Sequence, residues 1–151
     1  MADGHSDAGL EEVVDGLLEV ADRVHHVVSS VAARHDLTPQ QVGLLRMLAV
    51  PVSMRAFAEE LSCDPSNVTG LVDRAERLGL VARVPDPADR RVRILELTTK
   101  GRSLRSTINR EVTRSLAAAL GLCTDDHAKV MGVLGPMMSA MELPRTVPPD
   151  G

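Results

Sequence analysis

The stretch from residue 64 to residue 101 constrains the fold most, because its first part predicts a helix with two defined ends. Asp64 and Pro65 are typical of a helix start, since an aspartate caps free backbone N–H groups and a proline is tolerated at the first helical position. Gly79 is the residue type that most readily ends a helix in a left-handed conformation. The sequence therefore predicts a helix from 65 to 78.

Apolar residues recur along this helix at a spacing that puts them on one face. They are Val68, Leu71, Val72, Ala75 and Leu78. The remaining positions are small, polar and partly cationic. We expect the apolar face to be buried and the other face to be open to a partner.

A β-hairpin is predicted directly after the helix. Residues 80–85 and 92–97 are rich in aliphatic and β-branched residues, and the charged segment 86–91 between them favours a turn. Upstream, Ser53 is a suitable cap for a short helix, and only residues 62–64 separate that helix from the next. Helix, short turn, helix and hairpin are the elements of a winged helix-turn-helix.

The same residues resemble a known family. The segment LSCDPSNVTGLVDRAERLGLVARVPDPADRRVRILELTTKG is similar to the core of the MarR family of transcriptional regulators. It contains the S-x-V-T-x-L-V-D-R helix, the G-L-V-x-R strand entry, the D-x-x-D-R-R wing and the L-T-x-x-G exit. The resemblance implies binding to double-stranded DNA, a homodimer, and a crevice for a small-molecule effector between the dimerisation helices and the DNA-reading lobe.

Helical patterns flank this region on both sides. A wide apolar stripe predicts a long helix from Leu10 to about His35, with more apolar surface than one contact covers. Thr38 and Gln41 have the spacing of a capping box at the start of the next helix. After the hairpin we expect a long helix ending near Gly121 and a last helix capped by Thr124.

The expected fold class is mainly α with a small β-hairpin wing, in which a winged helix-turn-helix DNA-binding lobe is joined to N- and C-terminal dimerisation helices. No linker separates the parts, which predicts one domain. The expected divisions are a disordered N-terminus at 1–9, a single MarR-like winged-helix domain at 10–141 and an irregular tail at 142–151. Within the domain they are a lobe at about 38–100 and dimerisation helices at about 10–35 and 99–141.

Charge is segregated along the chain, so the net charge of −4 does not exclude DNA binding. Residues 1–22 hold seven acids and no Lys or Arg, whereas residues 74–114 hold eleven Lys/Arg against five acids, a balance of 11 − 5 = +6. Exposed charges farther apart than about 8–10 Å are largely screened at physiological salt, so the local balance decides phosphate attraction. The alternative is that these arginines only solvate helices.

The residues predicted to contact DNA lie on the second helix and on the wing. Short polar side chains in the first turns of a helix, with its free N–H groups, suit phosphates or base edges, and arginines suit phosphates, guanine edges or a narrow minor groove. The alternative for the helix positions is an ordinary solvated face. Asp73 has the spacing to pair with Arg77, and Asp89 is expected to orient a wing guanidinium, a role that the resemblance also implies. The candidates are Ser66, Asn67, Thr69, Gly70, Arg74, Arg77, Asp89, Arg90 and Arg91.

Catalytic, metal and cofactor sites find little support in the sequence. His25 and His26 lack a third ligand at suitable spacing, and there is no Gly-rich phosphate loop or serine nucleophile motif. Cys63 and Cys123 belong to no ligand cluster, which fits a reducing cytoplasm. No run of residues has the length of a transmembrane helix, so no membrane contact is expected.

The sequence thus predicts a homodimeric transcriptional regulator, a repressor that binds an inverted-repeat operator and is released by a small-molecule effector. Two alternatives remain open. In the first, the chain is a winged-helix module for protein contacts alone. In the second, it is a regulator without a ligand that senses oxidation through Cys63, in the turn before the second helix.

Overall fold

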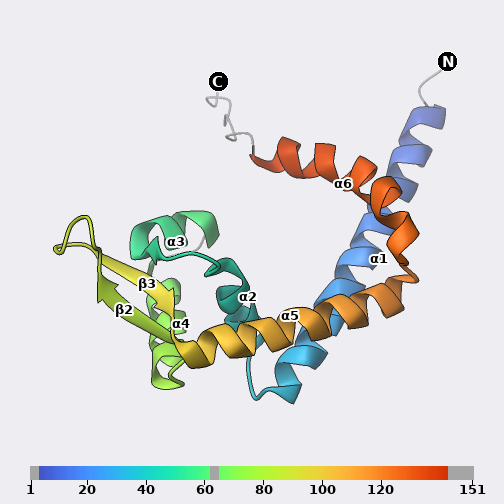
Figure 1. Cartoon of the computed structure of the whole chain (residues 1–151). Helices are drawn as coiled ribbons and strands as arrows, with labels where there is room; N and C mark the ends of the chain where they lie inside the picture. Colours follow the sequence, from blue (N-terminus) through green and yellow to red (C-terminus); the bar gives the residue numbers. More distant parts are fainter. Residues whose placement is uncertain (1–3, 62–64, 143–151) are drawn as a thin grey trace, which may run out of the picture.

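The structure is a computed structural model that describes residues 4–61 and 65–142, and the side chains of residues 8–59 and 67–140 within them. A lobe of short helices and a sheet lies at one end of the molecule, and α5 connects it with the end formed by α6 and the first half of α1 (Figure 1). The elements are α1 (Gly4–Arg34), α2 (Pro39–Met47), β1 (Val52–Ser53), α3 (Met54–Leu61), α4 (Pro65–Arg77), β2 (Val81–Pro85), β3 (Arg93–Leu97), α5 (Thr99–Leu120), the 3₁₀ helix η1 (Thr124–Asp126) and α6 (His127–Glu142). The predicted class, mainly α with a β-hairpin wing, is confirmed.

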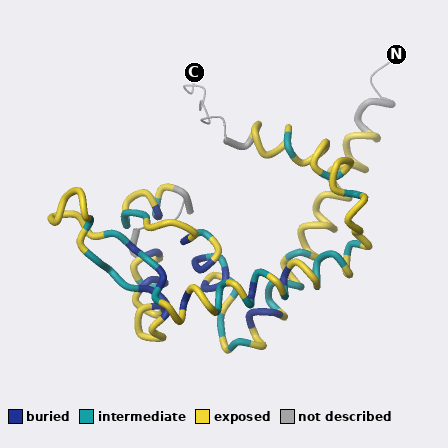
Figure 2. The backbone as a smooth tube through the Cα atoms, viewed as in Figure 1, coloured by how far each residue is buried: buried dark blue, intermediate teal, exposed yellow. Residues whose placement is uncertain are grey.

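One hydrophobic core fills the lobe and extends to the long helices. The last turns of α1 pack on α5 and α2, and α2 packs in turn on α4. Val31 of α1 and Ile108 and Val112 of α5 are buried in the same cluster as Phe57 of α3. Figure 2 shows buried segments in the lobe and where α5 meets the last part of α1. Apart from Phe57, the buried apolar residues of the described chain are aliphatic. The single core explains why α5 begins as part of the lobe and continues away from it.

The predicted ends of α2 and α4 are largely confirmed. The Thr38 side chain accepts a hydrogen bond from the Gln41 N–H at 3.2 Å, and the Gln41 side chain accepts one from the Thr38 N–H at 2.8 Å, which completes the capping box. Gly79 has a left-handed φ of +69°, and the Leu80 N–H donates back to Ala75 O at 3.0 Å. The predicted cap of α4 at Asp64 falls outside the described residues.

The predicted apolar face of α4 is buried except at its end. Val68, Val72 and Ala75 are almost fully buried, and Leu71 is 8% exposed. The prediction for Leu78 was wrong, because this side chain is 41% exposed. It lies in the turn that follows the last helical residue, where the chain no longer keeps the helical period.

The hairpin forms a sheet with a third strand that the sequence did not predict. Strands β2 and β3 pair antiparallel from Val81 opposite Leu97 to Pro85 opposite Arg93, and β1 pairs on the other side of β3. A strand of two residues is too short to show the alternation by which strands are recognised. Its second residue, Ser53, also caps α3 by accepting the Ala56 N–H at 3.1 Å, as predicted.

The start of α5 is fixed to the lobe through a glycine. Thr98 caps the helix by accepting the Gly101 N–H at 3.0 Å, and Gly121 ends it with a φ of +63°. A Cβ atom at Gly101 would lie 2.0 Å from the backbone oxygen of Leu80. The last glycine of the L-T-x-x-G motif is therefore required by the close approach of α5 to the turn after α4.

Both ends of the helical framework differ in detail from the expectation. Helix α1 begins at Gly4, although residues 1–9 were expected to be disordered. Extending an existing helix costs far less than nucleating one, so the long pattern after Leu10 continues backward. Thr124 does not cap α6. Instead it begins η1, and Asp126 accepts hydrogen bonds from the Cys123 N–H at 2.9 Å and from its thiol at 3.0 Å.

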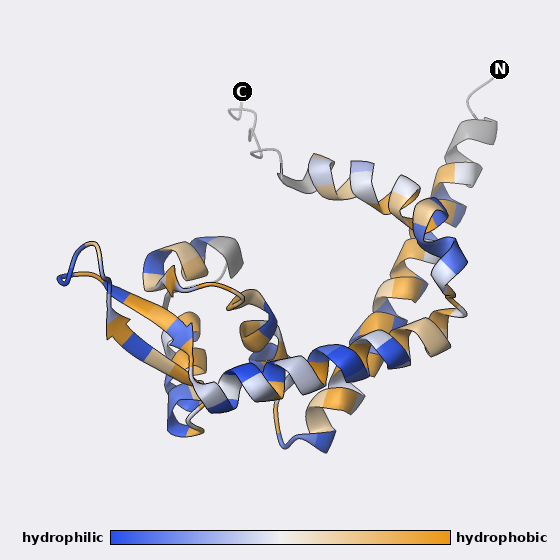
Figure 3. Cartoon of the chain, viewed as in Figure 1, coloured by the Kyte–Doolittle hydropathy of each residue, from blue (hydrophilic) through white to orange (hydrophobic). Residues whose placement is uncertain are grey.

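Large apolar side chains are exposed at the end of the molecule opposite the lobe. Apolar segments alternate with polar or neutral ones along α6 and the first half of α1 (Figure 3). On α1 the exposed ones are Leu10, Val13, Val14, Leu17, Leu18 and Val20, and on α6 they are Met131, Val133, Leu134, Met137 and Met138. Within the described residues, neither α1 nor any other helix is long and apolar enough to cross a membrane.

Candidate nucleic-acid interface

The exposed side of α4 brings together most of the residues predicted to contact DNA. Asn67, Thr69, Arg74 and Arg77 are exposed, and Gly70 lies half-buried among them. They occupy the arc that the helix leaves free when its apolar face packs into the core. The side chain of Ser66, the remaining candidate on this helix, lies outside the described residues, as does Cys63.

Arg74 and Asn67 lie at the side of this arc that faces α2. Both line a surface hollow together with Gly43 of α2, and the Arg74 Nη1 atom lies 3.6 Å from the point where a Cβ of Gly70 would be. Arg74 therefore extends along the helix over Gly70. This glycine leaves the surface beside the guanidinium open.

The wing ends in a turn that its own aspartates stabilise. Asp86 Oδ1 accepts the Ala88 N–H at 2.8 Å, and Asp89 Oδ1 accepts the Arg91 N–H at 3.0 Å. Asp89 was expected to orient a wing guanidinium, but among the described residues it has no ion pair with Arg90 or Arg91. Its carboxylate shapes the backbone of the tip instead.

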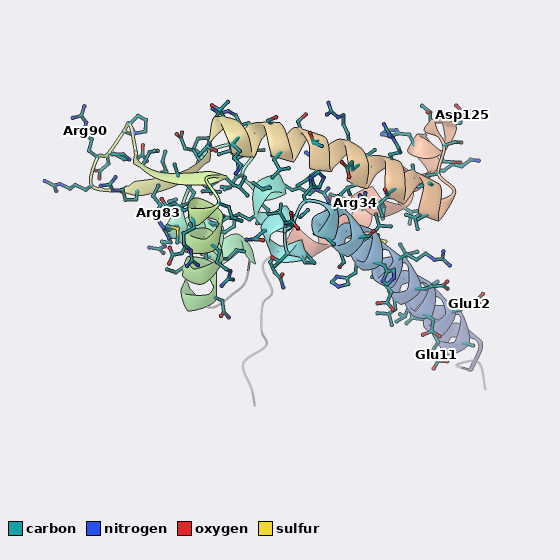
Figure 4. All side chains as sticks on the ribbon, turned by 90° about the horizontal axis from the view of Figure 1, so that it is seen from below. Glu11, Glu12, Arg34, Arg83, Arg90 and Asp125 are labelled. Carbon is teal, nitrogen blue, oxygen red and sulfur yellow. The ribbon has the colours of Figure 1, made fainter. Side chains whose placement is uncertain are left out.

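The two arginines of the wing are exposed at its outer end. Arg90 extends beyond the last strand residues, away from the rest of the lobe (Figure 4). Neither Arg90 nor Arg91 has an acidic partner within the described chain. A planar cation held at the end of a hairpin has the shape and charge that suit a narrow, electronegative groove.

Sequence reasoning missed the ion pairs that join the wing to α4. Arg83 Nη2 on β2 lies 2.5 Å from Asp73 Oδ1, and its Nη1 atom bonds Glu76. The expected Asp73–Arg77 pair does not form, because Arg83 is closer in space although it is ten residues away in sequence. Partial burial lowers the pKa of Arg83, but hydrogen bonding to Asp73 and the charge of Glu76 outweigh it and raise the pKa.

A second ionic group connects α1 with α5. Glu111 accepts hydrogen bonds from Arg34 Nη2 at 3.0 Å and lies 3.1 Å from His35 Nε2. The hydrogen bond from Arg34 is the largest cause that lowers the pKa of Glu111. No sequence motif indicated this group, because Glu111 is more than 75 positions away from both of its partners.

No candidate metal centre accompanies these surfaces. Among residues 4–61 and 65–142, no three His, Cys, Asp or Glu side chains gather closely enough to hold a metal ion. The lobe exposes the polar face of α4 and a hairpin with two arginines at its tip. These two elements on one helix-turn-helix define the class of winged helix-turn-helix proteins.

Comparisons with known proteins show which family within this class the chain resembles. Residues 35–92 match the model of the MarR family. The transcriptional activatory protein BadR of Rhodopseudomonas palustris is 36% identical over 91 residues, which cover 57% of this chain and 52% of that protein. The chain thus matches about half the length of this relative.

Solved structures extend the likeness to most of the fold. CouR from Rhodococcus jostii, bound to p-coumaroyl-CoA, superposes with a TM-score of 0.73 at 28% identity, over 87% of this chain and 92% of that one. A mutant MarR from E. coli complexed with operator DNA superposes with a TM-score of 0.67 at 22% identity, over 85% and 95%. The central segment of the chain thus matches the MarR family model, and its fold is that of MarR-type winged-helix structures.

Proposed function

We propose that the protein is a transcriptional regulator that binds double-stranded DNA as a homodimer, with α4 in the major groove and the wing against the flanking minor groove. The observation that carries this proposal is the joint exposure of the polar α4 face and the arginine tip on one lobe. The MarR structure with operator DNA supports it, because its fold is shared.

The proposed contacts divide into two kinds. Ser66, Asn67, Thr69, Gly70, Arg74 and Arg77 supply the helix that meets base edges and phosphates. Arg90 and Arg91 supply the groove contact, and Asp89 holds the tip in shape. Since the two recognition helices of a dimer are related by a two-fold axis, the operator is an inverted repeat with half-sites about 10 base pairs apart, or a multiple of that spacing.

The second copy covers the exposed apolar end of the molecule. Eleven large apolar side chains on α1 and α6 are exposed in the single chain. Surfaces of this kind mark protein contacts in soluble proteins. A homodimer buries them on both copies at once and sets the distance between the two lobes.

Release from DNA follows the binding of a small-molecule effector. CouR, which shares the fold, is bound to p-coumaroyl-CoA, and this supports a ligand site in the family fold. We place the effector crevice between the dimerisation helices and the lobe, without assigning its residues. The proposed effect on transcription is repression, whereas BadR is named as an activatory protein.

Selection of DNA by the purified protein tests this function. Genomic fragments retained by the protein should share an inverted repeat, and binding should weaken steeply as salt rises, since each neutralised phosphate releases counterions. A reporter gene behind a selected fragment should be more active when the regulator is absent. No DNA retained at low salt would contradict the proposal and favour a module for protein contacts.

A further inference from the structure

We propose that Arg83 is a positioning residue for DNA recognition, which fixes α4 against the wing and neutralises two carboxylates on the exposed side of α4. This role rests on the proposed function and deepens it. The three residues Arg83, Asp73 and Glu76 are called the Arg83 bridge below.

The geometry of the Arg83 bridge joins the two elements that are proposed to enter adjacent grooves. The guanidinium bonds Asp73 at 2.5 Å and Glu76, and the Arg83 backbone N–H donates to Glu76 Oε1 at 3.3 Å. Arg83 is the middle residue of β2, where it pairs with Leu95 of β3. The two acids lie one turn apart on α4, so the bridge holds both position and rotation of this helix relative to the wing.

The bridge is better shielded than the ion pairs formed within single helices, Arg23–Glu19 and Arg55–Glu59. The Arg83 side chain is 25% exposed, whereas both partners of the Arg23–Glu19 pair on α1 are more than half exposed. Solvent screens the latter pair strongly, and pairs of that kind contribute little. An arginine fork that bonds two carboxylates is also more directional than a single contact.

Charge gives the bridge a second effect. The exposed side of α4 carries Asp73 and Glu76 together with Arg74 and Arg77, so its formal charges cancel without Arg83. Without Arg83, these two carboxylates would offset the attraction of the two helix arginines for phosphates beside the proposed DNA contact. Arg83 offsets these two charges through its ion pairs with Asp73 and Glu76.

The two possible roles of Arg83, positioning α4 and contacting a phosphate, predict opposite changes in DNA affinity for one variant. Asp73→Asn with Glu76→Gln removes two negative charges at the DNA surface and frees Arg83. If charge alone mattered, or if Arg83 bound phosphate, this variant would bind DNA more tightly. If the bridge positions α4, the same variant loses affinity for its own site although its charge favours DNA.

The experiment uses a duplex that the full-length wild-type protein selects from a random library, and a shuffled duplex of equal composition. Dissociation constants are measured at several salt concentrations for wild type, Arg83→Ala and the double amide variant. We expect both variants to bind the selected duplex about tenfold more weakly, the size of effect typical of coupled networks. The double amide variant should bind the shuffled duplex as tightly as wild type or more tightly, so that discrimination falls.

Three further variants separate positioning from loss of folding. Arg83→Lys keeps one charge and should retain part of the discrimination, whereas Arg83→Ala in the double amide background should be no worse than Arg83→Ala alone. Glu19→Gln, which removes the exposed pair on α1, should leave discrimination unchanged. Thermal unfolding of the near-isosteric double amide variant should show a folded protein.

Two results would overturn the role of Arg83. Tighter binding of the double amide variant to the selected duplex would show that the bridge does not position α4. A salt slope lower by about one in Arg83→Ala, with equal losses on both duplexes, would identify a direct phosphate contact instead. Failure of the wild-type protein to select any duplex would contradict the proposed function itself, and the positioning role with it.

Discussion

The lobe buries most of its large apolar side chains, whereas the opposite end of the molecule, formed by α6 and the first half of α1, exposes them. In the lobe, Phe57, Leu44, Leu80 and Leu95 are buried within a single chain. At the other end, Leu10 of α1 is 61% exposed and Val133 of α6 is 63% exposed. The same aliphatic composition therefore serves a core in one region and an open face in the other. The comparison teaches that the lobe buries most of its large apolar residues within one chain, whereas the other end leaves an apolar face that the proposed second copy would cover.

The largest expected effect comes from adding a side-chain atom at Gly101, where α5 lies against the backbone of Leu80. Gly101→Ala places a Cβ against the backbone of Leu80, which cannot move away as a side chain could. We expect a loss of about 3 kcal/mol in the free energy of unfolding, at the upper end of overpacking effects. Urea denaturation measures it.

Gly43→Ala on α2 is the control for this change, because nothing lies within 4 Å of its Cβ position. Alanine is also favoured over glycine in a helix by up to about 1 kcal/mol. The control should be neutral or stabilising. Equal stability of Gly101→Ala and wild type would contradict the close packing of α5 on the lobe.

The next largest effect is expected on dimerisation, from a charge placed at the end opposite the lobe. Leu17→Lys places a charge in the proposed dimer interface, and Leu78→Lys makes the same change at a lobe position with the same exposed fraction of 41%. Leu17→Lys should weaken dimerisation about a hundredfold, as expected for a well-buried contact residue. Sedimentation velocity should show that Leu78→Lys remains dimeric. Dissociation of both variants, or of neither, would remove the distinction between the two ends.

Within the lobe, Arg74→Ala tests sequence reading by α4. If this arginine reads a guanine, its loss should relax discrimination at one base pair by about 1–3 kcal/mol. Binding to a set of duplexes, each with one changed base pair, locates the effect. Uniform weakening over all sequences would instead make Arg74 a phosphate contact.

A smaller and more uniform effect is expected at the wing. Arg90→Ala should weaken binding to nearly all sequences and lower the salt slope by about one, because the wing is proposed to recognise the charge and shape of the DNA groove rather than its bases. Titrations at several salt concentrations with matched and shuffled duplexes measure the slope. An unchanged affinity would exclude the proposed position of the wing.

The smallest effect concerns the ion pairs that join the end of α1 to α5. The pKa of Glu111 is lowered from its ordinary value of 4.5, chiefly by the Arg34 hydrogen bond. A depressed carboxyl pKa stabilises the fold above 4.5, and this contribution is lost as pH falls from there through the folded-state pKa. Glu111→Gln should therefore unfold more easily than wild type near pH 7, and the difference should shrink under acid conditions. Urea denaturation at both pH values measures it, and a difference that grows toward acid pH would contradict the sign.

Local signals were enough to predict the helices and the hairpin of the lobe. Thr38, Gln41, Gly79 and Thr98 act as helix boundaries through contacts with residues near them in sequence, and such contacts leave a pattern in the chain. The two strands of the hairpin were predicted within one residue for the same reason.

What the sequence did not predict depends on contacts between distant residues. Strand β1 is defined only by its pairing with β3, and the partner of Asp73 is Arg83 on another element rather than Arg77 on the same helix. The roles of the candidate site residues toward DNA stay predictions. The structure adds that Asn67, Thr69, Arg74 and Arg77 on α4 and Asp89, Arg90 and Arg91 on the wing are exposed on one lobe.

Hydroxyl-radical footprinting of a selected duplex tests the central claim most directly, because it reports the arrangement of both lobes on DNA at once. A dimer joined through α1 and α6 predicts protection of two half-sites related by a two-fold axis, about 10 base pairs apart or a multiple of that, with further protection in the outer minor grooves where Arg90 lies. Protection of a single half-site, or of a direct repeat without a two-fold axis, would contradict the account.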